Sequence, residues 1–469
     1  MHIAQRITKN FLWLFIGEAT GNGLAFLSTV YLSRTLTDTG FGKLAFAQAV
    51  TTYLVLIVNS GLPIFGIREI AKFKEQVKEF AMNIVLLRLL FAMLIFLIFT
   101  VTIWQLHFPR EMKILLTGTA LWVFSQAIYS DFAFQGLEKM QFVAVGRAVV
   151  QSLYLLAIFF FIKGSEDLTT VPLLRFGSEL FGGATLLIIF FILLGKWSFK
   201  AVNIASWKAY LKEAWVIAAS LILINIYYTF DTLLLGLMDK PAVVGWYNAA
   251  YKVIMLFVGI AALLQMAFAP FFASQKDNPE LFKKGMAGFS MILIFLSALI
   301  CGTLFLGSHD LIKFLYGDSY LTSIPIIRFL AIALFFIYLD TIFLSPLLFT
   351  GFQKYYLFSV LIGAVSNIIL NLILIPIWSY KGAAIATISS NFLIAVSGFI
   401  FFARGFYFDR HLVKNILLGI ATLGAVLFTI YKLQLSSLIA VSLFILLFSS
   451  LFLIHHKSEI EFVFKKLKL

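Results

Sequence analysis

Residues 134–139 read FQGLEK, and about 215 residues later the chain nearly repeats them as FTGFQK at residues 349–354. Each copy is a short polar turn between two long apolar stretches. A second pair of segments, GKLAFA at 42–47 and GWYNAA at 245–250, occurs in the same order. The repetition predicts two copies of one structural unit followed by a tail, with the function located where the copies meet.

The composition predicts an integral membrane protein. Of the 469 residues 61% are hydrophobic and 12% are charged, and the mean hydropathy is +0.99. A soluble domain carries about 25% charged residues. The net charge of +14 is assigned to basic loops on one side of the membrane rather than to a nucleic-acid partner. With Cys301 as the single cysteine, an intrachain disulfide and a cysteine-based zinc site are excluded.

Fourteen segments have the length of about 20 mainly apolar residues that a membrane-spanning helix needs. They lie at roughly 10–33, 42–62, 80–104, 113–130, 141–162, 171–194, 212–236, 243–268, 286–306, 325–348, 355–377, 382–403, 412–430 and 435–454. Lys and Arg are concentrated in alternate connections, which places both termini in the cytoplasm. The longest outer connection predicts a short surface helix over 310–317, closed by Gly317.

These segments predict an all-α polytopic membrane protein. Residues 1–200 form a lobe of helices 1–6 and residues 201–407 form a lobe of helices 7–12. An even number of spans in each copy predicts a pseudo-twofold axis along the membrane normal, with a cavity between the lobes. Residues 408–469, which hold helices 13 and 14 and a basic cytoplasmic tail, have no counterpart in the first copy and are expected at the periphery.

Charged residues within spans are expensive and by default mark a transport pathway or an ion pair. The candidate substrate-binding residues are Arg88, Arg147, Arg175, Lys252, Arg328 and Glu18. Each has an alternative. Arg175 has Glu179 four residues further on and can pair with it on one helix face, and Arg147 and Arg328 lie near span ends, where they can extend to the membrane surface. Glu18 lies beside three glycines and is a candidate for proton coupling.

A second group of polar residues occurs at one depth of the second copy. It consists of Asp231, Asn367, Asn371 and Thr387. Four oxygen-bearing side chains at one level can hold a small hard cation, and ordinary hydrogen bonding between helices is the alternative. A pair of Asp231 with Lys252 is another. The sequence shows no phosphate-binding loop, zinc-protease motif or nucleophile elbow, so we expect a transporter rather than an enzyme.

Several short segments in order resemble the Wzx-type oligosaccharide flippases of the multidrug/oligosaccharidyl-lipid/polysaccharide exporter superfamily. They are RTL at 34–36, GKLAFAQ at 42–48, NSGL at 59–62, REIA at 68–71, FQGLE at 134–138 and LYG at 315–317. The resemblance implies a monomer in the bacterial inner membrane that moves undecaprenyl-pyrophosphate-linked oligosaccharide repeat units from the inner to the outer leaflet by alternating access. It implies surface polysaccharide (O-antigen, lipopolysaccharide) biosynthesis, with glycosyltransferases and a polymerase as partners.

The resemblance also implies roles for the candidate residues. Arg and Lys would meet the pyrophosphate, and Na⁺ or H⁺ would be the coupling ion, with no other cofactor. Lipid II flippases of the superfamily have a sodium site that Asp231, Asn367 and Thr387 match, whereas Asn371 stands in place of an Asp and removes one charge. The alternatives are a multidrug/cation antiporter, which would need an acidic cavity, a passive scramblase, and a membrane polysaccharide polymerase or ligase, which would need a large outer loop.

Overall fold

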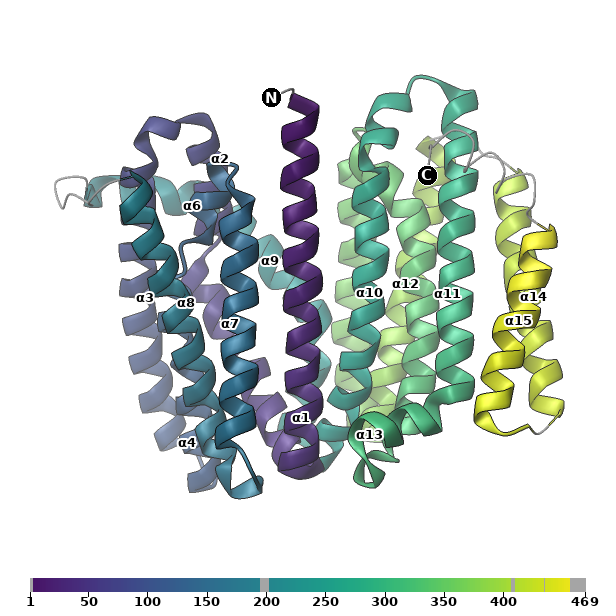
Figure 1. The fold of residues 1–469 in the computed structure, drawn as a ribbon, viewed down its shortest axis with the longest axis horizontal. Helices are drawn as coiled ribbons and strands as arrows, with labels where there is room; N and C mark the ends of the chain where they lie inside the picture. Colours follow the sequence, from purple (N-terminus) through teal and green to yellow (C-terminus); the bar gives the residue numbers. More distant parts are fainter. Residues whose placement is uncertain (1–2, 195–201, 406–409, 434, 456–469) are drawn as a thin grey trace. The chain divides into compact units, whose positions relative to one another are not determined.

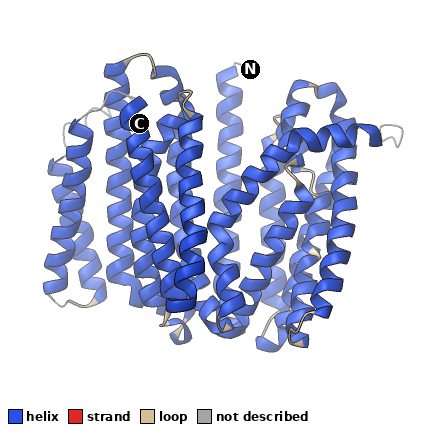
Figure 2. Cartoon of the chain, turned by 180° about the vertical axis from the view of Figure 1, so that it is seen from behind, coloured by secondary structure: helices blue, strands red, loops and turns tan. Residues whose placement is uncertain are grey.

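The computed structural model describes residues 3–194, 202–405, 410–433 and 435–455. Within these ranges the chain is helical and contains no strand (Figure 2). Ten of the described helices are long and apolar enough to cross a membrane, and many of their large apolar side chains stay exposed, such as Phe160 (65%) and Ile192 (76%). Hydrocarbon offers the backbone no hydrogen bonds, so helices that satisfy their own backbone suit such a surface. The prediction of an all-α multi-pass membrane protein is confirmed.

The chain forms two compact units, Met1–Gly245 and Trp246–Leu469. The first contains α1 (Ile3–Asn59), α2 (Leu62–Lys72), α3 (Val77–Gln105), α4 (Arg110–Ala120), α5 (Trp122–Ile128), α6 (Asp131–Gly136), α7 (Met140–Phe161), α8 (Val171–Leu194) and α9 (Ile204–Met238). Figure 1 labels these helices except α5. Helix α9, which the sequence assigns to the second lobe, packs against α1 and α2. The predicted boundaries after residues 200 and 407 and the basic tail lie outside the described residues.

Helix α1 contains two of the predicted spans. Its backbone leaves the helical conformation at Thr37 (φ 63°, ψ 174°). Gly17, before this kink, and Asn59, after it, line the same cavity, so the chain must fold back at Thr37. We call residues 3–36 the first arm of α1 and residues 38–59 its second arm.

The second unit also contains a long helix that folds back at one non-helical residue. Its helices are α10 (Pro241–Gln275), which begins in the first unit, then α11 (Pro279–Tyr316), α12 (Ser323–Phe349), α13 (Gln353–Gly405), α14 (Arg410–Lys432) and α15 (Ser437–His455). Helix α13 breaks at Ser379 (φ 54°, ψ −134°). A Cβ on Gly382 would lie 2.2 Å from the Leu374 carbonyl oxygen, so the two parts of α13 run back along each other. Each predicted span falls on a helical segment, whereas the number of fourteen crossings stays a prediction.

One local prediction is wrong. The sequence predicts a separate surface helix over 310–317, but α11 continues without a break to Tyr316 and ends at Gly317, whose φ is 89°. Ile312 and Tyr316 are 0% and 2% exposed. Because these side chains pack into the second unit, the helix keeps its direction beyond the apolar span.

The repeated segments differ in detail. In the second turn Gly351 is exposed and has the positive φ (99°), whereas in the first turn Glu138 has it (58°). Gly136 is instead packed closely, since a Cβ there would lie 2.8 Å from the Ile70 side chain. The residue that reverses the chain is therefore not the same in the two turns, and their superposition stays a prediction.

The glycines that begin the other two repeated segments, Gly42 and Gly245, pack closely within the first unit. A Cβ on Gly42 would lie 1.7 Å from the Pro241 carbonyl oxygen, and a Cβ on Gly245 would lie 2.1 Å from the Asp38 carbonyl oxygen. Each glycine thus faces the carbonyl four residues before the other glycine. These contacts explain why glycine is needed at both positions, and the predicted duplication stays a prediction.

We expect Gly42→Ala to destabilise the protein, because its methyl group has no room beside the Pro241 carbonyl. The cost of forcing an extra methyl group into a packed contact is about 1–3 kcal/mol. Gly23→Ala in the same helix is the control, since no atom lies within 4 Å of its Cβ position. Thermal unfolding of the purified protein in detergent measures both. Equal melting temperatures for the two variants would contradict the close contact.

Candidate functional site

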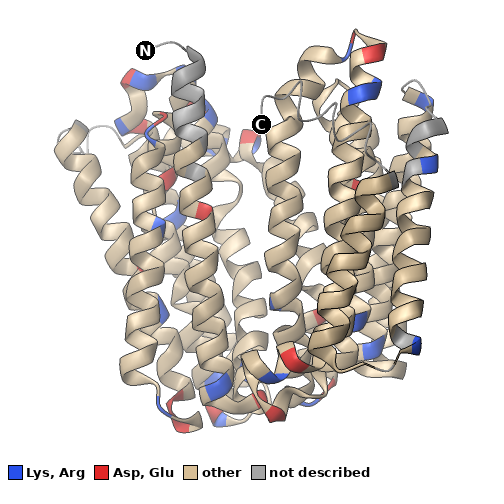
Figure 3. Ribbon diagram, turned by 45° about the vertical axis from the view of Figure 1, so that its right-hand side comes forward, with Lys and Arg blue, Asp and Glu red and all other residues tan. Residues whose placement is uncertain are grey.

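Charged residues lie mainly toward the ends of the helices (Figure 3). A group of them nevertheless lines a cavity of about 350 Å³ within the first unit. Its charged lining residues are Glu18, Arg88, Asp131, Arg147, Arg175 and Glu179. The volume is at the lower end of the range for ligand pockets, about 300–1,000 Å³.

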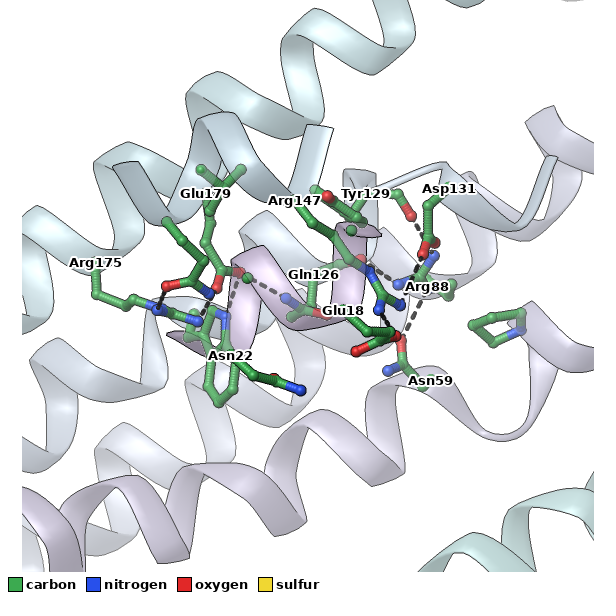
Figure 4. A pocket seen from close by; sticks show the side chains of 16 residues that line it. Glu18, Asn22, Asn59, Arg88, Gln126, Tyr129, Asp131, Arg147, Arg175 and Glu179 are labelled. Atoms are coloured by element: carbon green, nitrogen blue, oxygen red, sulfur yellow. Dashed lines mark hydrogen bonds and ion pairs between the residues drawn. The ribbon is translucent and has the colours of Figure 1, made fainter. Parts of the chain in front are cut away.

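The cavity is lined by residues of both arms of α1 and of α2, α3, α5, α6, α7 and α8 (Figure 4). Its uncharged polar and aromatic lining residues are Asn22, Asn59, Trp122, Gln126, Tyr129 and Gln151. Amide, carboxylate and guanidinium groups provide hydrogen-bond donors and acceptors on several sides. The site is therefore chemically suited to a polar ligand, although it lies among apolar helices.

A helix break forms one wall of the cavity. Helix α5 ends at Ile128, Tyr129 is extended (ψ 105°), and α6 begins at Asp131. Arg88 of α3, which is 2% exposed, donates to the Tyr129 carbonyl oxygen (3.1 Å) and to the Gln126 carbonyl oxygen at this end of α5. A cation that binds the last carbonyls of a helix satisfies them and opposes the helix dipole.

The guanidinium of Arg88 has a further partner. Its Nε donates to Asn59 Oδ1 at 3.0 Å, at the end of the second arm of α1. All three nitrogens of Arg88 thus bind protein groups. Arg88 lines the cavity, as expected for a candidate ligand, while its hydrogen bonds hold the break between α5 and α6.

The other side of the break carries an acidic residue. Asp131 is in the first turn of α6, where a negative charge is favourable. Its Oδ2 accepts a hydrogen bond from Gln135 Nε2 (3.0 Å) and lies 4.0 Å from Arg147 Nη2. Asp131 is not among the predicted site residues, because the sequence places it in a loop after the fourth span. No proline marks the break, and only the acidic residue at a helix start was a usable signal.

The pair of Arg175 and Glu179 that was an alternative in the sequence is confirmed. Arg175 Nη2 and Glu179 Oε1 lie 2.6 Å apart on α8. Glu179 also accepts hydrogen bonds from Gln126 Nε2 (2.5 Å) and from the Trp122 indole. Arg175 donates to Gln151 Oε1 (3.1 Å) and lies over the rings of two residues, Trp122 and Tyr154, 5.6 and 5.0 Å from their centroids.

Arg147 of α7 pairs with Glu18 on the first arm of α1. The helices are close here, since a Cβ on Gly17 would lie 2.7 Å from Ala144 Cα. Arg147 lines the cavity, and whether it also extends to the membrane surface stays a prediction. The sequence singles out both residues, but only the fold brings these positions, 129 residues apart, together.

The cavity differs from the expected one in charge. Three Arg face three carboxylates, so it is formally balanced, whereas the sequence suggests a net cationic site. It also lies within the first unit. The other two predicted cations, Lys252 of α10 and Arg328 of α12, belong to the second unit and are not among its lining residues.

Arg328 and Lys252 have different surroundings. Arg328 Nε donates to Ser308 Oγ (2.8 Å), and its guanidinium lies 5.3 Å from the Phe305 ring centroid. Arg328 is thereby held against α11. Lys252 is exposed. Whether either binds substrate stays a prediction.

The predicted sodium residues are divided between the units. In the second unit Asn371 Nδ2 donates to Asn367 Oδ1 (3.0 Å), and Asn367 Nδ2 donates to Ser390 Oγ (3.2 Å). Asn371 Oδ1 is buried without a hydrogen-bond partner. Thr387 Oγ1 donates to its own helix, and Asp231 lies on α9 in the first unit, where it accepts from the Thr232 amide (2.7 Å). The four-residue site stays a prediction.

The chain was compared with known proteins. The protein named "Putative O-antigen transporter" in Escherichia coli (strain K12) is 23% identical over 406 residues, which cover 83% of this chain and 94% of that protein. The structure of the lipid II flippase MurJ in an inward closed conformation is similar with a TM-score of 0.74, at 15% identity, over 97% of this chain and 100% of that one.

A further solved structure is an inward-facing multidrug resistance transporter of the MATE family in the MOP superfamily. It has a TM-score of 0.63 at 14% identity, over 81% of this chain and 93% of its own. At such identities these structures show a shared fold. The family model described as "Polysaccharide biosynthesis protein" matches residues 7–276. The chain therefore belongs to the polysaccharide biosynthesis protein family, and its resemblance to the Wzx-type oligosaccharide flippases is confirmed.

Proposed function

We propose that this protein is a flippase that moves polyprenyl-pyrophosphate-linked oligosaccharide repeat units from the inner to the outer leaflet of the bacterial inner membrane. The observation that carries the proposal is the cavity of about 350 Å³, lined by three Arg and three carboxylates, inside a bundle of apolar helices. Charges within a membrane are costly and mark transport pathways by default. The names of the relatives, an O-antigen transporter and a lipid II flippase, support this substrate class.

The chemistry of the cavity fits the polar head of such a substrate. Arg can bind pyrophosphate with two parallel hydrogen bonds, and the amides of Asn22 and Gln151 line the cavity beside Trp122 and Tyr129. Aromatic faces and polar side chains together suit a sugar. At about 350 Å³ the cavity takes part of the head group, while the lipid tail stays against the apolar exterior.

The membrane topology, the transport cycle and the partners that we propose are those that the sequence predicts. Fourteen spans with both termini in the cytoplasm form two six-helix lobes and two additional helices. Alternating access moves the head group for surface polysaccharide biosynthesis. Glycosyltransferases supply the substrate and a polymerase consumes it, and the transporter acts as a monomer.

A multidrug/cation antiporter of the same superfamily is the second candidate. A cationic drug would be favoured by a cavity with an excess of acidic groups, whereas here three Arg balance three carboxylates. A polymerase or ligase would need a large outer loop with catalytic residues. The described connections between helices are short, which favours transport over catalysis.

Transport in one direction needs a source of energy. The sequence has no nucleotide-binding motif, and a cation that crosses 100 mV contributes about 2.3 kcal/mol per charge. We propose that Na⁺ is the coupling ion, bound by Asp231, Asn367, Asn371 and Thr387. The partnerless buried oxygen of Asn371 supports this assignment, and coupling to H⁺ through Glu18 is the alternative.

The flippase function predicts that the purified protein in liposomes moves a lipid-linked oligosaccharide between leaflets. A fluorescent repeat unit on polyprenyl pyrophosphate is incorporated in both leaflets. A membrane-impermeant quencher removes the fluorescence of the outer leaflet, and the fluorescence that remains reports the inner pool. We expect this pool to become accessible only when the protein is present. Extrusion of a cationic dye with no movement of the lipid would instead show the antiporter.

The hydrogen bonds of Arg88 predict that Arg88→Ala mainly lowers the stability of the fold. Two carbonyl oxygens at the end of α5 would lose a buried partner, which costs about 3 kcal/mol or more. Lys163→Ala is the control, since Lys163 also bonds a carbonyl at a helix end, that of Phe159, but in an exposed setting. Thermal unfolding and lipid transport are measured together. A variant with an unchanged melting temperature and no transport would make Arg88 a substrate ligand instead.

The sodium site predicts that transport by Asp231→Asn no longer depends on Na⁺. The substitution removes the one carboxylate of the four residues and keeps the side-chain size. The rate is measured across a range of sodium concentrations at constant ionic strength. A normal sodium dependence in this variant rules the site out, and so does a wild-type rate that follows only the proton gradient.

A further inference from the structure

The ion pair between Arg147 and Glu18 is the cavity feature that the proposed function does not yet use. We propose that Glu18 is a built-in competitor for Arg147: its carboxylate holds the guanidinium in the absence of substrate and yields it to the pyrophosphate of the incoming lipid. The inference rests on the proposed function and deepens it. It assigns the pyrophosphate to one arginine and gives a carboxylate the role of tuning its affinity.

The hydrogen bonds of the other two arginines leave them less available. Arg88 is 2% exposed and donates through all three nitrogens to Asn59 and to the end of α5. Arg175 is held by Glu179 (2.6 Å) and Gln151 (3.1 Å). An anion that displaced either arginine would leave buried protein groups without partners, which is costly. Arg147 is the guanidinium in the cavity that can change partner at least cost.

The exposure of the pair supports this exchange. The side chains of Arg147 and Glu18 are 35% and 44% exposed, whereas that of Glu179, in the neighbouring pair, is 5% exposed. Partly exposed ion pairs contribute little to stability, because water competes for both groups. A pyrophosphate carries more charge than a carboxylate and offers more acceptor oxygens to a guanidinium. It should therefore displace Glu18.

The surroundings keep Arg147 in place during the exchange. Asp131 Oδ2 lies 4.0 Å from its Nη2, on α6, opposite the first arm of α1. Glu18 is held near it because Gly17 brings the first arm of α1 against Ala144 of α7. The carboxylate is therefore always close enough to return. A transporter must release its substrate as well as bind it, and a resident competitor lowers the cost of release.

The test compares binding and transport in four forms of the full-length protein. Binding of undecaprenyl pyrophosphate in detergent is measured for the wild type, Glu18→Gln, Arg147→Gln and the double variant. Undecaprenol serves as the ligand without the anion, and glucuronate as an acidic sugar. Glu111→Gln is the matched control, because Glu111 pairs with Lys43 at similar exposure (47% and 26%) away from the cavity.

We expect Glu18→Gln to bind undecaprenyl pyrophosphate about fivefold more tightly than the wild type, the factor that a partly exposed pair can contribute. It should transport more slowly, because release is slower. Arg147→Gln and the double variant should bind equally weakly, and Glu111→Gln should behave as wild type. Melting temperatures identify any variant that fails to fold. If Glu18→Gln fails to fold, Glu18→Asp, which keeps the charge, replaces it. An affinity of Glu18→Asp between those of the wild type and Arg147→Gln would overturn the proposal.

Three results of these measurements overturn the inference without touching the flippase function. One is unchanged affinity in Glu18→Gln while Arg147→Gln loses binding. Another is wild-type binding of undecaprenyl pyrophosphate that persists in Arg147→Gln. Binding of glucuronate that requires Arg147, with no preference for undecaprenyl pyrophosphate over undecaprenol, assigns the arginine to an acidic sugar and also overturns it. The proposed function itself fails only if lipid movement in liposomes is absent.

Discussion

The architecture of the cavity depends on the contact between Arg88 and the end of α5. A helix that stops among apolar helices leaves carbonyl groups without partners, and lipid cannot satisfy them there. Arg88 supplies the donors at this end, and Asp131 begins the next helix on the other side of the break. The break turns the chain so that Tyr129 and Asp131 both line the cavity. One buried guanidinium therefore shapes the wall on which the rest of the site is built.

A balanced cavity changes how the transport of an anion is understood. A site with only arginines would bind pyrophosphate tightly and would also hold it. Here three carboxylates face three arginines, and the partners differ in how firmly they are fixed. The pair of Arg175 and Glu179 is tied to neighbouring side chains, whereas the pair of Arg147 and Glu18 is half exposed. In the proposed exchange this unequal pairing would let Arg147 change partner while Arg88 and Arg175 hold the helices in position.

Close backbone contacts position these side chains. Gly17 brings the first arm of α1 to α7, and Gly42 and Gly245 let α1 approach the start of α10 within the first unit. In a membrane, helices are held by such packing rather than by the exclusion of water, so small residues at crossings matter more. Each unit also contains a fold-back within one long helix, at Thr37 and at Ser379. The first joins the first and second predicted spans and the second joins the eleventh and twelfth, so the two hairpins occupy different places of the predicted repeat.

The sequence alone determined the membrane class, the helical architecture, the family and most of the charged residues of the cavity. It did so because apolar length and buried charge are local properties, which a single chain displays without its fold. It did not determine which charges are partners. Glu18 and Arg147 lie 129 residues apart, and Asp131 was placed outside the membrane because no proline or glycine announces the break before it. Ion pairing and helix breaks depend on distances across the bundle, so only the tertiary structure could decide that the cavity is balanced rather than cationic.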